Sequence, residues 1–285
     1  MALGITRLAR VSLNSADAQT LARFYIDAFG FTVLEVPARF PHRLALALGT
    51  TRLDIVTTHG APYPGDVAGW SPLFQHCAIV TPDMTRAMAH LKTVSGWTAI
   101  SQGGPQQLPQ ASGGVTAFKF RDPEGHPLEF LEFSARSGAN ETRLFQDINH
   151  SAISVTNTQR SIAFYSALGL HAGASSLNQG PEQARLDSVP HPEVEVTALE
   201  FASQSTPHIE LLCYRGAFDR AGASARPDDI AASRLVCAVA TPDAVANLCQ
   251  SFLGQVLKQE SATALLRDPD GHLIEIELDG EATLN

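Results

Sequence analysis

The residues with the clearest chemical potential lie in a nine-residue phrase that occurs twice. Residues 121–129 are Arg-Asp-Pro-Glu-Gly-His-Pro-Leu-Glu, and residues 267–275 are Arg-Asp-Pro-Asp-Gly-His-Leu-Ile-Glu. Asp-Pro-acid-Gly is strong turn chemistry and alternating residues follow it, so each copy predicts a β-hairpin. Glu129 and Glu275 then hold corresponding positions on the second strand. A lone glutamate there would usually face solvent, but the repetition makes both candidates for chemistry.

The repeat extends well beyond these hairpins. Phe-Tyr at residues 24–25 lies in a predicted amphipathic helix after a strand and a turn, and the same order recurs around Phe-Tyr at 164–165. His-Cys-Ala-Ile-Val-Thr-Pro-Asp at 76–83 corresponds to Val-Cys-Ala-Val-Ala-Thr-Pro-Asp at 236–243. We therefore predict four β-α-β-β-β modules, numbered in chain order, at about residues 5–60, 72–134, 146–216 and 233–279. Modules 1 and 3 match each other, as do modules 2 and 4.

Length and composition predict a globular protein of two domains. The 285 residues are 44% hydrophobic and 17% charged, enough for two ordinary cores. We place the domains at residues 1–136 and 145–285, with two modules each, on either side of a small and polar linker at 135–142. The net charge of −9 disfavours nucleic acids and anionic membrane surfaces as partners. No run approaches the roughly 18 apolar residues needed to cross a bilayer.

Cysteine usage and the amino terminus favour a cytoplasmic location. Arg7 and Arg10 interrupt the first apolar stretch, which lacks the features of a secretory signal. The four cysteines form no Cys-x-x-Cys pair and lie in apolar stretches, as expected for reduced core residues. We expect a small-molecule partner and a monomer or homodimer.

The module plan, the two Asp-Pro-x-Gly-His-x-x-Glu hairpins and the His-Ser-Ala-Ile-Ser-Val opening at 150–155 resemble the vicinal oxygen chelate superfamily over nearly the whole chain. This resemblance implies an α+β fold in which four βαβββ modules form two cupped mixed sheets flanked by helices. The superfamily includes glyoxalase I, extradiol dioxygenases, methylmalonyl-CoA epimerase, and fosfomycin and bleomycin resistance proteins. The fold therefore does not select one activity.

The resemblance also implies where metal ligands would lie, because superfamily members take them from the first and last strands of each module. The corresponding first-strand positions are Arg10, His76, His150 and Val236. The corresponding last-strand positions are Asp54, Glu129, Glu210 and Glu275. If neighbouring modules shared a cup, neither cup would hold two histidines and one carboxylate, the set that holds iron(II) in the dioxygenases.

If modules 2 and 3 share a cup instead, it collects two imidazoles and two carboxylates, from His76, Glu129, His150 and Glu210. We favour this exchanged arrangement, which predicts one divalent ion: nickel, zinc, manganese, cobalt or iron(II). Glu129 or Glu210 would then be the catalytic base that removes a proton beside a metal-bound oxygen. The competing interpretation is that histidines at strand starts are ordinary hydrogen-bonded residues.

The other cup, from modules 1 and 4, would hold Arg10, Asp54, Val236 and Glu275. We expect Arg10 to form an ion pair with Asp54 or Glu275 in a degenerate site. The alternative is that Arg10 binds an anionic ligand. The histidines of the two hairpin turns, His126 and His272, are interpreted as structural.

These observations leave three functions open. The favoured one is a metal-dependent lyase or isomerase of the glyoxalase type that acts on a small molecule with adjacent oxygen functions. The first alternative is an iron(II) ring-cleaving dioxygenase. The second is a metal-free binding or resistance protein, with candidate aromatic lining residues Trp70, Phe74, Trp97 and Phe118. Loops at 102–107 and 178–183 are either ordinary turns or the rim of the module 2 and 3 cup.

Overall fold

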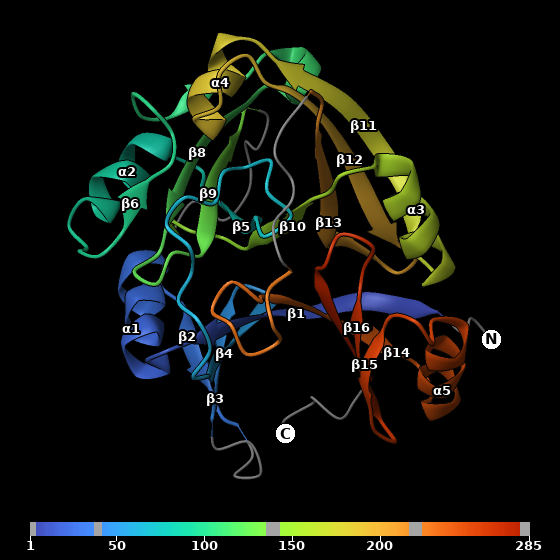
Figure 1. Cartoon of the computed structure of the whole chain (residues 1–285). Helices are drawn as coiled ribbons and strands as arrows, with labels where there is room; N and C mark the ends of the chain where they lie inside the picture. Colours follow the sequence, from blue (N-terminus) through green and yellow to red (C-terminus); the bar gives the residue numbers. More distant parts are fainter. Residues whose placement is uncertain (1–3, 37–41, 135–142, 217–223, 280–285) are drawn as a thin grey trace.

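Two large mixed sheets, one above the other in Figure 1, make up the protein. A computed structural model describes residues 4–36, 42–134, 143–216 and 224–279. The predicted linker at 135–142 lies outside these residues. The α+β fold class and the two cupped mixed sheets are confirmed. We name each sheet after the modules that supply its strands.

The 1–4 sheet has eight strands among the described residues, and its centre is the antiparallel pair β1 and β14. Parallel pairing adds β4 to β1 and β17 to β14, so the two modules extend the sheet in opposite directions. Its strands in spatial order are β15 (Val256–Gln259), β16 (Thr263–Arg267), β17 (Leu273–Leu278), β14 (Arg234–Val239), β1 (Ile5–Ser15), β4 (Thr51–Thr57), β3 (Arg43–Leu48) and β2 (Thr32–Leu34).

The 2–3 sheet repeats this plan around the antiparallel pair β5 and β10. The predicted exchange of modules is therefore confirmed, and each sheet takes one module from each half of the sequence. Its strands in spatial order are β11 (His171–Gln179), β12 (Glu193–Phe201), β13 (Gln204–Tyr214), β10 (Ile148–Ser154), β5 (Gln75–Val80), β9 (Pro127–Phe133), β8 (Val115–Arg121) and β6 (Thr98–Ala99), with β7 (Gln106–Gln107) also paired to β8.

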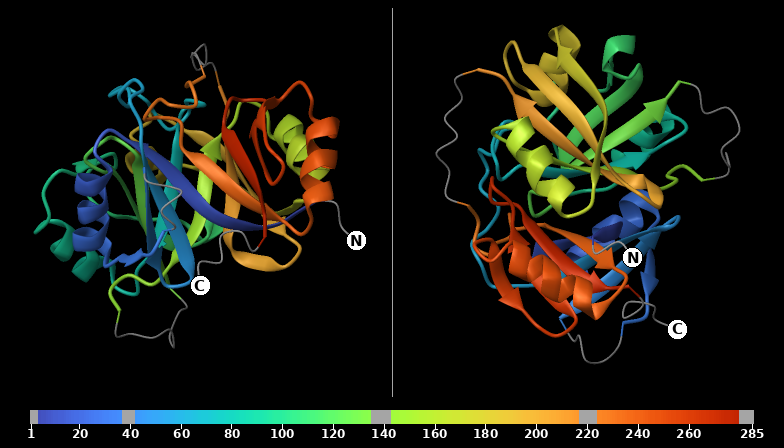
Figure 2. Two further views of the ribbon diagram at one scale, coloured as in Figure 1. Left: turned by 90° about the horizontal axis from the view of Figure 1, so that it is seen from below. Right: turned by 90° about the vertical axis from the view of Figure 1, so that its right-hand side faces the viewer.

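Helices flank both sheets, as the views in Figures 1 and 2 show. Their starts follow capping chemistry: the side chain of Asp17 accepts from the Thr20 N–H at the start of α1, and Asn157 accepts from the Arg160 N–H at the start of α3. The helices are α1 (Ala18–Phe29), α2 (Met84–Leu91), α3 (Thr158–Ala167), α4 (Pro181–Asp187) and α5 (Pro242–Ser251), with a 3₁₀ turn η1 (Gln110–Ser112). No described helix is both long and apolar enough to cross a bilayer.

Helix α1 belongs to module 1 in sequence but also packs on the 2–3 sheet. The ring of Phe29 lies 6.1 Å from that of Phe120 and 5.8 Å from that of Phe130, measured between centroids. All three rings are buried. Aromatic pairs at this spacing are favourable beyond the area they bury, so the apolar core is continuous between the two sheets.

The repeated hairpin turn ties module 2 to module 1. Asp122 accepts hydrogen bonds from the Tyr25 hydroxyl at 3.1 Å and the His126 ring at 2.8 Å, and all three groups are buried. Glu124 accepts from the Ser15 hydroxyl at 2.7 Å and from the backbone N–H of Asp17 at 3.1 Å, just before α1. A carboxylate at a helix start is favourable because the helix dipole is positive there.

Module 4 is tied to module 3 in the same way. Asp268 accepts from the Tyr165 hydroxyl at 3.1 Å, and Asp270 accepts from Arg160 at 2.7 Å beside the start of α3. The ring of His272 lies 2.8 Å from the Ser154 carbonyl oxygen. The structural interpretation of His126 and His272 agrees with these contacts. The phrase is therefore repeated because the same connection between the sheets is made twice.

One predicted element is wrong. Residues 184–187 form a weak strand-like segment in the sequence, but they lie in helix α4, which starts at Pro181 after Gly180 and ends where Ser188 turns left-handed with φ 55°. Proline is favourable in the first helical turn because its missing N–H would have no partner there. The first strand after α3 is instead β11. Its residues are mostly exposed, so its sequence lacks the alternation of apolar and polar residues that would predict a strand.

The hairpin contacts predict matched losses of stability. Tyr25→Phe and Tyr165→Phe each remove a buried hydrogen bond to a carboxylate, and each is expected to lower the free energy of unfolding by about 1.5–3 kcal/mol in urea denaturation. Ser251→Ala, which removes an exposed hydroxyl bonded to the Asn247 carbonyl, is the control, with an expected change below about 0.5 kcal/mol. Equal behaviour of all three variants would contradict this role for the tyrosines.

Candidate metal centre

The strand register brings the four predicted ligands to one cup. In the 2–3 sheet β5 carries His76 and pairs with β10, which carries His150. Glu129 lies on β9 beside β5, and Glu210 lies on β13 beside β10. All four side chains line one pocket with a cavity volume of about 500 Å³. Pairing within module 2 brings Glu129 beside His76, pairing within module 3 brings Glu210 beside His150, and the module exchange brings the two pairs together.

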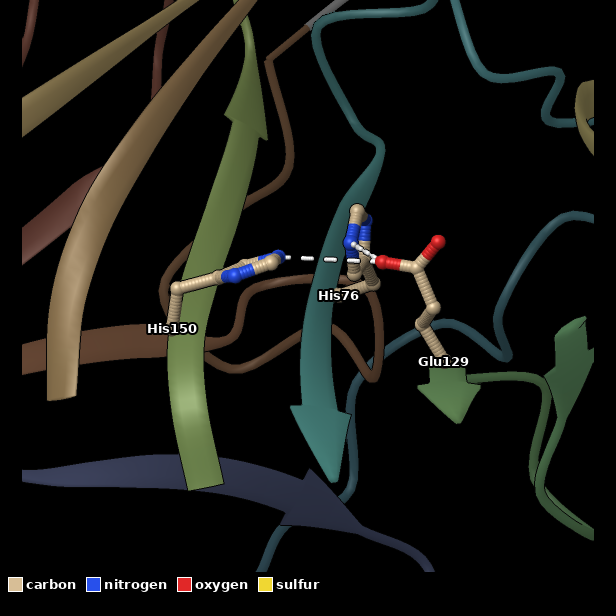
Figure 3. A group of neighbouring side chains, drawn as sticks. All are labelled: His76, Glu129 and His150. Atoms are coloured by element: carbon tan, nitrogen blue, oxygen red, sulfur yellow. Dashed lines mark hydrogen bonds and ion pairs between the residues drawn. The ribbon is translucent and has the colours of Figure 1, made fainter. Parts of the chain in front are cut away.

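The ligand atoms of His76, Glu129 and His150 face one another at the spacing of a metal site (Figure 3). Nε2 of His76 lies 3.0 Å from Oε2 of Glu129, and Nε2 of His150 lies 3.7 Å from the same oxygen and 3.6 Å from Oε2 of Glu210. Ligand atoms bound at ~2.1 Å around one ion are about 3–4 Å apart. Nε2 of His150 is buried yet has no hydrogen-bond partner, which is costly unless something binds it. The residues therefore fit a divalent ion.

The donors form two overlapping groups. His76, Glu129 and His150 form a buried inner group, and His150, His208 and Glu210 form a more exposed outer group; within each, the ligand atoms lie within 4.8 Å of one another. The sequence analysis missed His208. Its signal was present, because a residue two positions before Glu210 lies on the same face of a strand.

A buried cation also borders the cup, and the sequence analysis missed it as well. Lys119 lies opposite Glu129 in the strand register, and its Nζ is 2.7 Å from Oδ1 of Asp187 in helix α4. The Tyr214 hydroxyl and the Gln183 amide donate to the other oxygen of Asp187, at 2.9 and 2.7 Å. The charge of Lys119 is thus paired and held in place by the helix above the cup.

The neighbouring charges set the ionisation of the ligands. Burial raises the pKa of Glu129, but the charge of Lys119 and the two imidazoles outweigh it and hold that pKa well below its usual range. Burial lowers the pKa of His76. Burial also acts to lower the pKa of His150, but Glu210 and Glu129 outweigh it, so that pKa is raised. The pKa of Glu210 is lowered, because His150 and His208 outweigh the effect of its burial. Both carboxylates are therefore ionised at neutral pH and can hold a cation.

The walls of the pocket are apolar above this polar floor. Val115, Leu131, Phe133, Val194, Leu212 and Tyr214 line it. The four aromatic residues considered for a binding protein are not among the lining residues. Phe118 and Trp97 instead pack together with centroids 6.2 Å apart, and Phe118 belongs to the main core.

The loop at 102–107, considered as one rim of the cup, contacts helix α4, which begins within the other loop at 178–183. The Gln102 N–H donates to the Arg185 carbonyl at 2.8 Å, and Nε of Arg185 donates to the Gln106 side chain at 2.7 Å. Asn178 and Gln183 from the second loop line the pocket, whereas the lining from the other side begins at Leu108, just after the first loop. A role of these loops in binding substrate stays a prediction.

The 1–4 cup contains arginines where the 2–3 cup has histidines. Arg10 holds the position of His150 on the equivalent strand. The second position was assigned wrongly: Arg234, not Val236, lies beside Ser12 as His76 lies beside Ala152. The 1–4 cup therefore has two guanidinium groups in place of two imidazoles, and a guanidinium is always protonated and cannot bind a metal ion.

Buried ion pairs complete this second cup. Nε of Arg10 donates to Asp54 at 2.5 Å, and its other nitrogens donate to Glu277, one of them at 2.8 Å. The ion pair with Asp54 was predicted, but the second partner is Glu277, while Glu275 pairs with Arg234 at 3.1 Å. Since all three nitrogens of Arg10 donate to Asp54 or Glu277, these two carboxylates compensate its positive charge. The expectation of a degenerate site agrees with this network.

Comparisons with known proteins agree with this architecture. Residues 7–130 match the model of the Glyoxalase/Bleomycin resistance protein/Dioxygenase superfamily. The fold is similar to that of glyoxalase I from Zea mays, with a TM-score of 0.61, 18% identity, and coverage of 95% of this chain and 92% of that one. A point mutant of the same maize protein gives a TM-score of 0.68 at 18% identity, covering 95% of this chain and 92% of that one.

A putative dioxygenase from Bacillus subtilis is also similar in fold, with a TM-score of 0.59, 13% identity, and coverage of 98% of this chain and 87% of that one. No curated protein sequence matches the chain. At these identities the structural likeness concerns the fold.

Loss of the buried ion pairs in the 1–4 cup is expected to destabilise the fold more than loss of a partly exposed one. Arg10→Met removes the guanidinium that bridges Glu277 and Asp54 and leaves Asp54 with Arg43, at 3.3 Å, as its cationic partner. The free energy of unfolding of the metal-free protein is expected to fall by about 3–5 kcal/mol, because Glu277 loses this buried ion pair. Arg234→Met breaks a partly exposed pair with Glu275 and should cost about 1 kcal/mol or less. Urea titration measures both changes. Similar losses in the two variants would show that Arg10 does not hold this cup together.

Proposed function

We propose that this chain is a divalent-metal-dependent lyase or isomerase of the glyoxalase type. Its residues 7–130 match the model of the Glyoxalase/Bleomycin resistance protein/Dioxygenase superfamily, and its fold is similar to that of glyoxalase I over 95% of the chain. Its substrate is a small molecule with two adjacent oxygen functions. The observation that carries the proposal is the convergence of three imidazoles and two carboxylates on one pocket, with a buried, unpartnered nitrogen at the centre.

His76, Glu129, His150 and Glu210 would hold the ion, and their ligand types suit nickel, zinc, manganese, cobalt or iron(II). When bound, a divalent ion supplies Lewis-acid stabilisation of negative charge that develops on substrate oxygens. Apolar side chains on the pocket walls lower the local dielectric constant and so strengthen electrostatic interactions with this charge.

Burial assigns different roles to the two carboxylates. The Glu129 side chain is 7% exposed and lies between two imidazoles on the pocket floor, whereas the Glu210 side chain is 21% exposed on the substrate side. We assign Glu129 to anchoring the ion. We assign Glu210 as the base: it lines the pocket and, because its pKa is lowered, it is ionised and able to accept a proton at a carboxylate oxygen.

The inner group supports a second candidate function. His76, Glu129 and His150 are two histidines and one carboxylate, the donor set typical of non-haem iron(II) oxygenases. One similar structure carries the description of a putative dioxygenase. The alternative is therefore an extradiol-type ring-cleaving dioxygenase that contains iron(II), with Glu210 outside the ligand set.

Metal content tests the proposal with a matched pair of variants. Wild type, reconstituted with nickel, zinc, manganese or iron(II) and desalted, is expected to hold about one ion per chain by elemental analysis. Glu129→Gln should lose it, because an amide cannot neutralise a cation. Glu275→Gln changes the corresponding residue of the 1–4 cup and should keep it. Wild type without metal after all four reconstitutions would leave a metal-free binding protein as the function.

Activity tests the role of Glu210. Screening covers thiol adducts of 2-oxoaldehydes for isomerisation and catechols for ring cleavage. Glu210→Gln is expected to lower kcat by about 10²–10⁴-fold on an isomerised substrate while the ion stays bound, because a catalytic base is lost. Glu193→Gln, at an exposed glutamate on β12 that does not line this pocket, is the control and should stay near wild type. A Glu210→Gln enzyme with unchanged kcat would remove Glu210 from the mechanism.

A further inference from the structure

His208 is a histidine of the pocket that the superfamily ligand positions do not include. It lies on β13 directly beside His150 in the strand register, and its Nε2 is 3.2 Å from Oε1 of Glu210. Its side chain is 15% exposed and lines the pocket. The five groups form a row in which imidazole and carboxylate alternate, with separations of 3.0, 3.7, 3.6 and 3.2 Å between successive ligand atoms.

The two donor groups of this row cannot hold two ions at once. They share His150, and its Nδ1 already lies 3.1 Å from the Asn149 side-chain oxygen. Only the unpartnered Nε2 faces the pocket. One imidazole nitrogen binds one metal ion, so two ions cannot use His150 together.

Charge balance favours an ion that uses both groups. Each group has a single carboxylate, Glu129 or Glu210, and a buried divalent cation is more stable when two carboxylates compensate its charge. The five ligand atoms do not form one group within 4.8 Å, so the outer side chains must turn inward to reach the ion. Lys119 contributes nothing to this compensation, because its own positive charge lies beside Glu129. Drawing Glu210 to the ion also brings in His208, which offers a ring nitrogen within 4.8 Å of both other ligand atoms in the outer group.

We propose that His208 is a metal ligand, so that three imidazoles hold the ion together with the carboxylates. This inference rests on the metal centre of the proposed function and deepens it. An imidazole-rich set favours zinc, nickel and iron over magnesium and calcium. It also lets Glu210 leave the ion to accept a proton, because His76, Glu129, His150 and His208 still hold the ion.

X-ray absorption spectroscopy of the zinc form tests this directly, because it counts imidazoles around the ion. The expected count is three in wild type and two in both His208→Ala and His208→Gln, with zinc affinity lower by more than about 100-fold, above the range typical of a lost outer contact. His171→Ala, an exposed histidine on β11 of the same sheet, is the control and should keep three. Thermal unfolding of the metal-free variants checks that they fold.

The glutamine variant separates a ligand from a positioning residue. Its amide can still donate to Glu210 but is a poor metal ligand. Two imidazoles in wild type, with an affinity that His208→Gln restores, would overturn the proposal and leave the metal centre intact. A wild type that binds no zinc would overturn the metal centre itself, so the two failures are distinguishable.

Discussion

The antiparallel pairing of β5 with β10 is the contact on which the candidate site depends. These strands come from modules 2 and 3, on either side of the predicted domain boundary, and their pairing places His76 and His150 on one face with ring centroids 5.5 Å apart. Parallel pairing of β9 to β5 and of β13 to β10 then adds one carboxylate on each side. Had modules 1 and 2 formed one sheet, each histidine would have faced a different cup.

The two cups solve the same electrostatic problem in different ways. Each places carboxylates in a sheet interior, where an uncompensated negative charge is costly. In the 1–4 cup the guanidinium of Arg10 supplies the positive charge and bridges Asp54 and Glu277. In the 2–3 cup, His150 leaves a nitrogen without a partner between Glu129 and Glu210. A cation from solution can supply the missing charge only in this second arrangement.

The sequence was informative wherever a residue type repeats at matching positions. The hairpin phrase and the modules follow from such repeats, and the quartet around His150 follows from the resemblance to the superfamily together with the pairing of modules 2 and 3. Val236 was misassigned because the alignment of modules 2 and 4 matched Thr-Pro-Asp at 81–83 with Thr-Pro-Asp at 241–243. In the structure the residues that cap the two helices are Asp83 and Thr241, so these are the equivalent positions. This moves the true counterpart of His76 two residues earlier, to Arg234.

Other parts of the site have no counterpart in the repeat. His208 and Lys119 matter only through the strand register and through Asp187 of helix α4, which local sequence patterns do not reveal. Sequence patterns therefore predict the strands that carry such a site better than the charged and imidazole side chains, such as Lys119 and His208, that surround it.

The central claim is that this chain has one metal site and that it lies in the 2–3 cup. Anomalous diffraction from crystals of the zinc form, recorded on both sides of the zinc edge, locates every bound ion. The account predicts one peak per chain, next to Nε2 of His150, and none beside Arg10. A peak in the 1–4 cup, or a 2–3 cup without one at saturating zinc, would contradict it.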